Sequence, residues 1–255
     1  MVNLARTAAL AAVGALLGGL VTASVAPAAL AATGDLSIEA SKVLELKLDG
    51  DLADTSANAA AVSLQRGAAA YATGIDGQAF SFNGATALKL GTASYLQPQD
   101  LTVSFWYNPS AAMSGEQVFA WSKTAYNSDG WYLTSEGGTT PLALSIGPST
   151  GQPYKVAVDA DRATFFPAGQ WTHVVATYDH TTKAVAFYRN GVRQQANVKT
   201  PVSATASGVL GSEGTSTKTI GYNGPNYNGS YLNGRLDDYA LYNGVATVAD
   251  VVTPL

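Results

Sequence analysis

Ser149 stands at the centre of a segment, G-P-S-T-G, that has the spacing of a serine nucleophile motif. Asp159 or Asp161 and then His173 follow it in the chain order of one class of hydrolase. Such a set would carry acyl transfer, with the serine as nucleophile and the histidine as its general base. That motif requires a strand that turns directly into a helix. Here the segment lies between two strand patterns and contains a turn-forming proline, so we interpret it as a hairpin loop.

Paired carboxylates are the second catalytic arrangement that the residues could supply. Glycoside hydrolysis usually needs two carboxyl groups about 5–10 Å apart across a sugar-binding cleft. No glutamate has a second acidic residue two positions away on a strand; the glutamates are Glu39, Glu45, Glu116, Glu136 and Glu213. Asp237 and Asp238 are adjacent, and neighbours on a regular strand face opposite sides of the sheet. The sequence therefore predicts a protein that is not an enzyme.

Two connections combine aromatic side chains with amides, which is the chemistry of sugar recognition. A pyranose ring offers an apolar face for stacking on aromatic rings, and its hydroxyls bond to amides and carboxylates. The connections span residues 126–132 and 222–231. Turn formation and packing at a sheet rim are the structural alternative for the same residues. The expected ligand contacts are Tyr126, Asn127, Asp129, Trp131, Tyr222, Asn223, Asn226, Tyr227 and Tyr231.

Short strands must position these side chains. Runs rich in Val, Tyr, Phe and Leu recur between clusters of Gly, Pro, Asn and Asp, which is typical of strands and turns. The predicted strands are 43–48, 79–82, 87–90, 101–107, 117–122, 131–134, 142–146, 155–158, 171–179, 184–191, 218–222 and 234–243. Only residues 245–252 show a brief helical pattern. About a dozen short strands without long helical periodicity predict an all-β, two-sheet antiparallel sandwich.

Three segments in the second half of the chain form a recognisable series. Residues 171–179 read WTHVVATYD, residues 188–191 read YRNG, and residues 234–242 read GRLDDYALY. They resemble the laminin-G-like, concanavalin A-like jelly-roll family, whose members carry W-H-V-A-x-T-Y-D, then Y-x-N-G, then G-x-I-D-D/E-V-x-x-Y. The resemblance implies a concanavalin A-like jelly roll, a fold that the family uses both in binding domains and in glucanases.

Three N-terminal segments resemble the same family. They are LDGDLADTSAN at 48–58, GQAFSFNG at 77–84 and LTVSFW at 101–106, with Ala57 where glycine is usual and Asn83 where aspartate is usual. With the C-terminal signatures they extend the resemblance over a core of about residues 43–252, which implies one domain. The glucanases of this fold carry an E-x-D-x-x-E type of motif, which this sequence lacks.

The resemblance also implies a structural calcium as an option, because some members bind one through the aspartate at position 237. Strand alternation puts Asp237 on the face of Tyr239, which points inward in the family, and a carboxylate facing a core needs a partner. The expected metal ligands are Asp49, Asp51 and Asp237 with nearby carbonyls. Calcium takes six to eight oxygens, and Asn83 weakens the set, so a hydrogen-bonded structural aspartate is the alternative. No cofactor is required.

The family signature also contains Trp171 and His173, which share a strand face because they are two residues apart. His173 could act as a general base, but no carboxylate is near it in sequence. We therefore expect a histidine that is partly buried and hydrogen-bonded to a neighbouring strand. Trp171, as a signature strand residue, is expected to contribute several kcal/mol to folding.

The first 31 of the 255 residues are expected to form a secretory signal peptide. Arg6 supplies positive charge, residues 8–25 are apolar apart from Gly, Thr and Ser, and residues 29–31 offer the A-x-A triplet that signal peptidase requires. An uncleaved anchor is the alternative, although small Ala and Gly side chains make a weak one. Residues 32–255 would then be a single secreted, extracellular domain that does not associate with membranes.

Charge and cysteine content further limit the classes of molecule that the protein is expected to bind. The chain has 14 basic and 18 acidic residues, and losing Arg6 leaves 13 basic residues and a net charge of −5. An acidic chain without basic clusters is a poor nucleic-acid binder. The chain has no cysteine, which excludes disulfides and thiolate metal sites. We expect a secreted binding domain for a carbohydrate or glycoconjugate; the alternatives are a glycan hydrolase or lyase and a protein-binding cell-surface module.

Export is expected to release a chain that begins at Ala32 or within a few residues of it. Intact-mass spectrometry of the medium and of washed membranes measures the mature start. A double substitution of Ala29 and Ala31 by Phe should block cleavage, because signal peptidase accepts only small residues at those positions. Full-length precursor confined to membranes, with none released, would contradict the prediction.

Overall fold

In the computed structural model the chain divides into two units, Met1–Leu30 and Ala31–Leu255. The structure describes parts of the second unit only, residues 41–124, 128–137, 140–147, 153–200, 216–224 and 230–247. The predicted signal peptide lies outside these residues. Within them, no helix is both long enough and apolar enough to cross a membrane.

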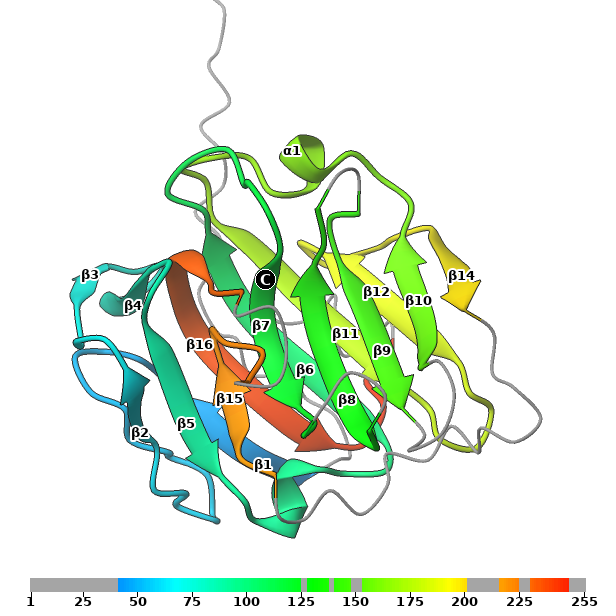
Figure 1. Ribbon diagram of the computed structural model, residues 1–255, viewed down its shortest axis with the longest axis horizontal. Helices are drawn as coiled ribbons and strands as arrows, with labels where there is room; N and C mark the ends of the chain where they lie inside the picture. Colours follow the sequence, from blue (N-terminus) through cyan, green and yellow to red (C-terminus); the bar gives the residue numbers. More distant parts are fainter. Residues whose placement is uncertain are drawn as a thin grey trace, which may run out of the picture. The chain divides into compact units, whose positions relative to one another are not determined.

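Two antiparallel sheets form the described fold, one in front of the other in Figure 1. Sheet A runs β13 (Val192–Arg193), β12 (Val185–Arg189), β11 (Thr172–Tyr178), β6 (Leu101–Asn108), β16 (Asn233–Asn243), β4 (Gln78–Asn83) and β3 (Tyr71–Thr73), and β1 (Ser41–Leu46) also pairs with β16. Sheet B runs β14 (Ala196–Thr200), β10 (Tyr154–Val158), β9 (Ala143–Gly147), β8 (Gly130–Ser135), β7 (Gln117–Ser122), β15 (Lys218–Ile220), β5 (Ala87–Gly91) and β2 (Ser63–Arg66). The predicted all-β, two-sheet antiparallel sandwich is confirmed.

The inner faces of the two sheets share one hydrophobic core. On β6, Phe105 and Tyr107 point into it, as alternation predicts, and both contact Phe119 of β7 in the other sheet with ring centroids 4.9 and 5.0 Å apart. Burying a large apolar side chain contributes about 1.5–3 kcal/mol, so this layer dominates stability. The alternate residues of each strand, such as Trp106, lie on what we call the outer face of their sheet.

The sequence did not predict four short strands or one turn of helix. These are β2, β3, β13 and β14, of two to five residues, and α1 (Arg162–Phe165); a 3-10 turn covers Ser94–Leu96. The residues of β2 and β13 are all exposed, so their sequences carry no apolar alternation. The helix expected over residues 245–252 does not begin in 245–247, which are irregular, and the rest lies outside the described residues.

A β-bulge in β16 reverses the expected facing of Asp237. Asp237 lies opposite Trp106, the next paired residue is Ala240, and Asp238 between them has a φ of 45°. An extra residue shifts the alternation by one, so Asp237 is on the outer face while Tyr239 is in the core. The expectation that Asp237 and Tyr239 share a face is therefore wrong, because it assumed an unbroken strand.

The structure also exchanges the roles expected of two tryptophans. Trp131 belongs to the core and is 2% exposed, so its ring offers no face to a ligand. Trp171 is half-buried and belongs to none of the hydrophobic clusters of the described residues. Its ring instead lies 5.2 Å from the guanidinium of Arg235.

Trp131→Ala is therefore expected to lower the free energy of unfolding by about 3–5 kcal/mol, the cost of removing a buried tryptophan and leaving a cavity. Trp171→Ala should cost only about 1 kcal/mol, which is the size of an exposed cation–π contact. Urea unfolding of both variants measures the difference. Equal losses in the two variants would contradict the assignment.

Candidate functional site

The described ends of the two connections rich in Tyr and Asn lie close together on the outer face of sheet B. Tyr132 lies opposite Trp121 across β7 and β8, with ring centroids 4.9 Å apart, and the two form a cluster separate from the core. Gly224 follows β15, and a β-carbon placed on it would lie 3.4 Å from the indole nitrogen of Trp121. The start of the second connection therefore passes over the aromatic pair to which the first connection leads.

Next to this pair lies a three-membered stack, which we call the tyrosine stack: Arg66, Tyr222 and Tyr231. The tyrosine rings are 4.9 Å apart and nearly parallel, and the Arg66 guanidinium lies 5.0 Å from the Tyr222 ring. A backbone bridge joins Tyr222 to Tyr231. Tyr222 is buried, Tyr231 is half-buried and Arg66 is exposed. The stack thus presents an aromatic ring and a guanidinium to the surroundings.

Gly221 allows this arrangement. Its φ is +82°, and a β-carbon there would lie 2.6 Å from the Phe82 ring. Any other residue would strain the backbone and displace a core aromatic. Because Gly221 can lie this close to Phe82, the chain leaves β15 in a direction that places Tyr222 beside Tyr231.

Two glutamates lie at the rim beside the stack. Gln117 pairs with Ser135, so the flanking residues Glu116 and Glu136 lie at the same end of β7 and β8. Glu116 accepts a hydrogen bond from Ser230 at 3.1 Å, and Glu136 forms a 2.5 Å ion pair with Lys155. The sequence did not reveal this pairing, because it depends on strand register rather than on local spacing.

The predicted ligand residues divide into three groups. Tyr231 stays available as a contact, Asp129 is half-buried, and Tyr222 and Asn223 are buried at 3% and 1% exposure. Trp131 is a core residue and is withdrawn from the set. Tyr126, Asn127, Asn226 and Tyr227 lie outside the described residues. Arg66 was missed because the short exposed strand β2 that carries it has no recognisable pattern.

The serine–aspartate–histidine interpretation gains no support. His173 is buried, its Nε2 lies 2.9 Å from the Ser104 hydroxyl on the neighbouring strand, and burial lowers its pKa to about 4. Asp161 instead caps α1, accepting a hydrogen bond from the Thr164 amide. Ser149 lies outside the described residues. The expected hydrogen-bonded structural histidine is confirmed.

The aspartates proposed as metal ligands act as hydrogen-bond acceptors. Asp237 is 1% exposed, and its two oxygens accept from the amides of Ile75 (2.8 Å) and Asp238 (3.0 Å). Asp49 accepts from the Gln78 amide at 2.7 Å. These bonds tie the turn before β4 to the end of β1 and to β16.

Burial raises the pKa of Asp237 to about 7, and the negative charges of Asp238 and Asp49 add to this while the Ile75 amide opposes it. Burial also raises the pKa of Asp238, although Lys47 opposes that change. The bulge therefore puts two adjacent carboxylates close enough to repel each other. The expectation that they face opposite sides is wrong for the same reason as above.

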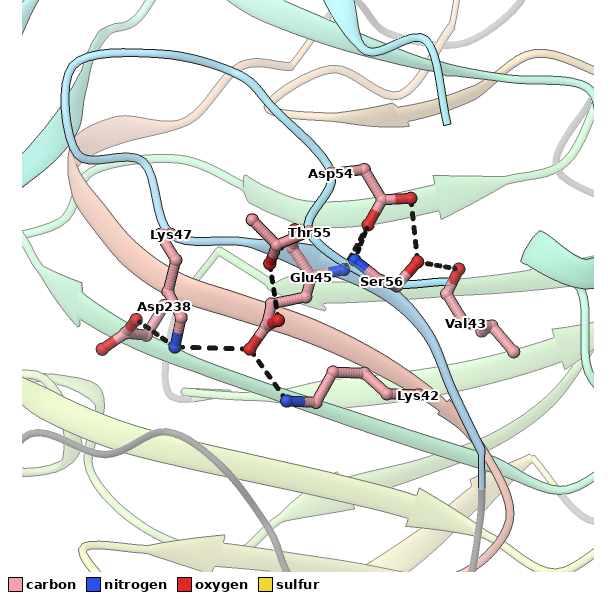
Figure 2. A network of polar contacts seen from close by, with 8 residues as sticks. All are labelled: Lys42, Val43, Glu45, Lys47, Asp54, Thr55, Ser56 and Asp238. Atoms are coloured by element: carbon pink, nitrogen blue, oxygen red, sulfur yellow. Dashed lines mark hydrogen bonds and ion pairs between the residues drawn. The ribbon is translucent and has the colours of Figure 1, made fainter. Parts of the chain in front are cut away.

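Figure 2 shows how the charges nearby are neutralised. Lys47 bridges Glu45 and Asp238 at 3.3 Å each, and Lys42 binds Glu45 at 2.8 Å. Burial would raise the pKa of Glu45, but hydrogen bonds from Lys42 and Thr55 and the charges of both lysines hold it at about 2. Glu45 is thus part of a structural network.

The described side chains do not by themselves build a calcium site. In the described ranges no three His, Cys, Asp or Glu side chains come close enough together to hold a metal. Asp51 closes its own turn, accepting from the Ala53 amide at 3.0 Å. Asp49 and Asp237 keep lone pairs, but each already binds backbone. The hydrogen-bonded alternative accounts for all three residues.

Comparison with solved structures finds the same fold in several other proteins. One is domain 4 of AbnA, a GH43 extracellular arabinanase from Geobacillus stearothermophilus, in complex with arabinotriose: 22% identical, covering 85% of this chain and 99% of that one, with a TM-score of 0.62. Another is botulinum neurotoxin type C, described as dependent on two ganglioside molecules for cell entry: 16% identical, covering 83% and 50%, TM-score 0.60. A third is the binding domain of botulinum neurotoxin DC in complex with rat synaptotagmin II. It is 15% identical, the match covers 83% of this chain and 50% of that one, and the TM-score is 0.57.

This chain spans about half the length of the toxin chains. No curated protein sequence is significantly similar to it. The family profile described as concanavalin A-like lectin/glucanases superfamily matches residues 82–252, which is more than half of the chain. With the two-sheet fold, this match shows that the chain belongs to the concanavalin A-like lectin/glucanase superfamily.

Proposed function

We propose that this protein is an exported, non-catalytic domain that binds a carbohydrate or glycoconjugate at the tyrosine stack. The observation that carries the proposal is the juxtaposition of Tyr231, Tyr222 and the exposed Arg66. A partly exposed tyrosine supplies a stacking face, and the guanidinium supplies several donors for sugar hydroxyls. Ser230 and Glu116 add a hydroxyl and a carboxylate at the rim.

The solved relatives support a glycan as the class of ligand. One was solved with arabinotriose and another is described by its interaction with gangliosides. The synaptotagmin complex supports the protein-binding alternative, for which the tyrosine stack could also serve as an anchor. We favour the glycan because a stack rimmed by polar groups suits hydroxyl-rich ligands better than an apolar protein surface.

Glycoside hydrolysis is the second candidate, since Glu116 and Glu136 end neighbouring strands at the rim. Cross-strand neighbours have β-carbons about 4.5–5.5 Å apart, a spacing compatible with a carboxylate pair. However, Glu136 is held by Lys155 and Glu116 by Ser230. We therefore propose binding without turnover.

Tyr231→Ala and Arg66→Ala are each expected to weaken glycan binding by about 1–2 kcal/mol, or roughly 5- to 30-fold in Kd, because each removes one partly exposed contact. A glycan array identifies the ligand, and calorimetry measures the variants. Arg193→Ala is the matched control, an exposed arginine on β13 in the other sheet. Unchanged binding in both test variants, or reducing sugar released by the wild type but not by Glu136→Gln, would overturn the proposal.

For Asp237 we propose a protonation-linked structural role, with calcium binding as the competing proposal. Its folded pKa of about 7 exceeds the ordinary 3.8, so the folded state binds the proton more tightly. The destabilisation is present above pH 7 and is relieved as the pH falls through 7 toward 4, by on the order of a few kcal/mol. In chelator, wild type should therefore gain stability relative to Asp237→Asn between pH 8 and pH 5.

Melting curves of both proteins measure this difference, and the comparison cancels the opposing titration of His173, which favours unfolding as the pH falls below 6.5. Parallel pH profiles would contradict the raised pKa. If calcium instead raises the melting temperature of wild type but not of Asp237→Asn, the ion binds at this carboxylate.

A further inference from the structure

The outer face of sheet A carries a row of four polar or aromatic residues near one end of β16. Arg235 pairs with Ser81 on β4 and with Asn108 on β6. Thr172 pairs with Tyr107, so Trp171 comes next to Asn108 at the start of β11. The neighbours Leu236, Tyr107 and Phe80 point into the core, which places the row on the opposite, outer face. We call Ser81, Arg235, Asn108 and Trp171 the arginine–tryptophan row.

Trp171 is set apart from the other tryptophans by its exposure. Trp106, Trp121 and Trp131 are each 2% exposed, whereas Trp171 is half-buried. It makes no contribution to the hydrophobic clusters of the described residues and contacts Arg235 instead. An indole held at the surface by a guanidinium is a platform for a flat or ring-shaped ligand.

Arg235 is fixed in place while most of its donors stay available. One nitrogen, Nη1, donates to the Thr73 carbonyl at 2.7 Å. Within the described segments no carboxylate forms an ion pair with it, whereas Lys42, Lys47 and Lys155 each bind a glutamate or aspartate. A guanidinium has five N–H donors in a fork that matches a carboxylate. Its charge and geometry therefore favour an anionic ligand.

A second observation lies in the adjoining row of the same face. Trp106 is two residues from Asn108 on β6, and its indole nitrogen is buried with no hydrogen-bond partner among the described atoms. An unsatisfied buried N–H costs about 1–3 kcal/mol. An acceptor supplied by a ligand or its bound water would remove that cost. Beside it, the half-buried Ser81 hydroxyl can bond to a sugar hydroxyl, whereas Asn108 is only 2% exposed and lies beneath the surface.

We propose that the arginine–tryptophan row is a second binding site, specific for an acidic sugar. The carboxylate binds the Arg235 guanidinium, the sugar ring stacks on Trp171, and a hydroxyl bonds to Ser81. This site lies on the opposite sheet from the tyrosine stack and does not depend on the function proposed there. The chemistry fits uronates and sialates alike, since both carry a carboxylate on a pyranose ring.

The test measures binding of trigalacturonate and sialyllactose to the purified protein by calorimetry, with galactotriose and lactose as their neutral counterparts. Arg235→Gln should raise the Kd for at least one acidic sugar tenfold or more. Higher salt concentration should weaken the binding of that sugar to the wild-type protein. Arg235→Lys, which keeps the charge but loses the fork, should give a smaller loss. Arg193→Gln is the matched control, an exposed arginine on β13 that should leave acidic-sugar binding unchanged. Arg66→Gln tests separately whether the sugar binds at the tyrosine stack instead.

Indole resonances provide an independent readout that does not depend on the stability of the Arg235 variants. An acidic sugar should shift one indole N–H signal that disappears in Trp171→Phe and, by its contact with the site, a second one from Trp106. The proposal fails if neither acidic sugar binds at about 10 mM, if the neutral sugars bind equally well, or if Arg66→Gln alone abolishes binding. Tighter binding of a peptide carboxylate than of both sugar acids would also overturn it.

Discussion

The hydrogen bonding of β16 is the constraint on which the rest of the fold depends. This strand pairs with β6 along one edge and with β1 and β4 along the other, so it joins the first and last parts of the described fold. In a regular strand Asp237 and Tyr239 would share a face, so a core position for Tyr239 would turn the Asp237 carboxylate inward as well. The bulge at Asp238 resolves this by shifting the alternation midway along the strand.

The consequences of the bulge extend beyond β16. On the N-terminal side of the bulge, Arg235 faces outward beside Trp171. At the bulge, Asp237 accepts a hydrogen bond from the Ile75 amide and so anchors the turn that leads to β4. After it, Tyr239 enters the core against Phe105. One extra residue thus keeps the Asp237 carboxylate out of the core while Tyr239 enters it. Backbone amides offset part of the cost of burying Asp237, and the ion pair with Lys47 offsets part of the cost of burying Asp238.

Both candidate sites use the face of a sheet that the core does not use. The tyrosine stack lies over sheet B and the arginine–tryptophan row over sheet A. In each, an arginine lies against an aromatic ring, and a rigid strand or backbone bridge fixes the ring. Such preorganisation limits the side-chain entropy lost when a ligand binds, which is why sites built on sheets bind rigid sugars well.

Local sequence determined most of the strands, the fold class and the family, because alternation and turn residues are encoded over four to eight positions, whereas the short exposed strands β2 and β13 carry no such pattern. For that reason the family motifs that contain Trp171 and Asp237 could be recognised from the sequence. Tertiary structure decided which face each residue takes and which residues meet. Trp131 lies in the core and Trp171 at the surface, the reverse of what the sequence indicated. Arg66 contacts Tyr222 although its strand, β2, is exposed and has no apolar alternation. The bulge at Asp238 puts Asp237 on the outer face. Facing depends on bulges and register, which arise only when strands distant in the chain pair.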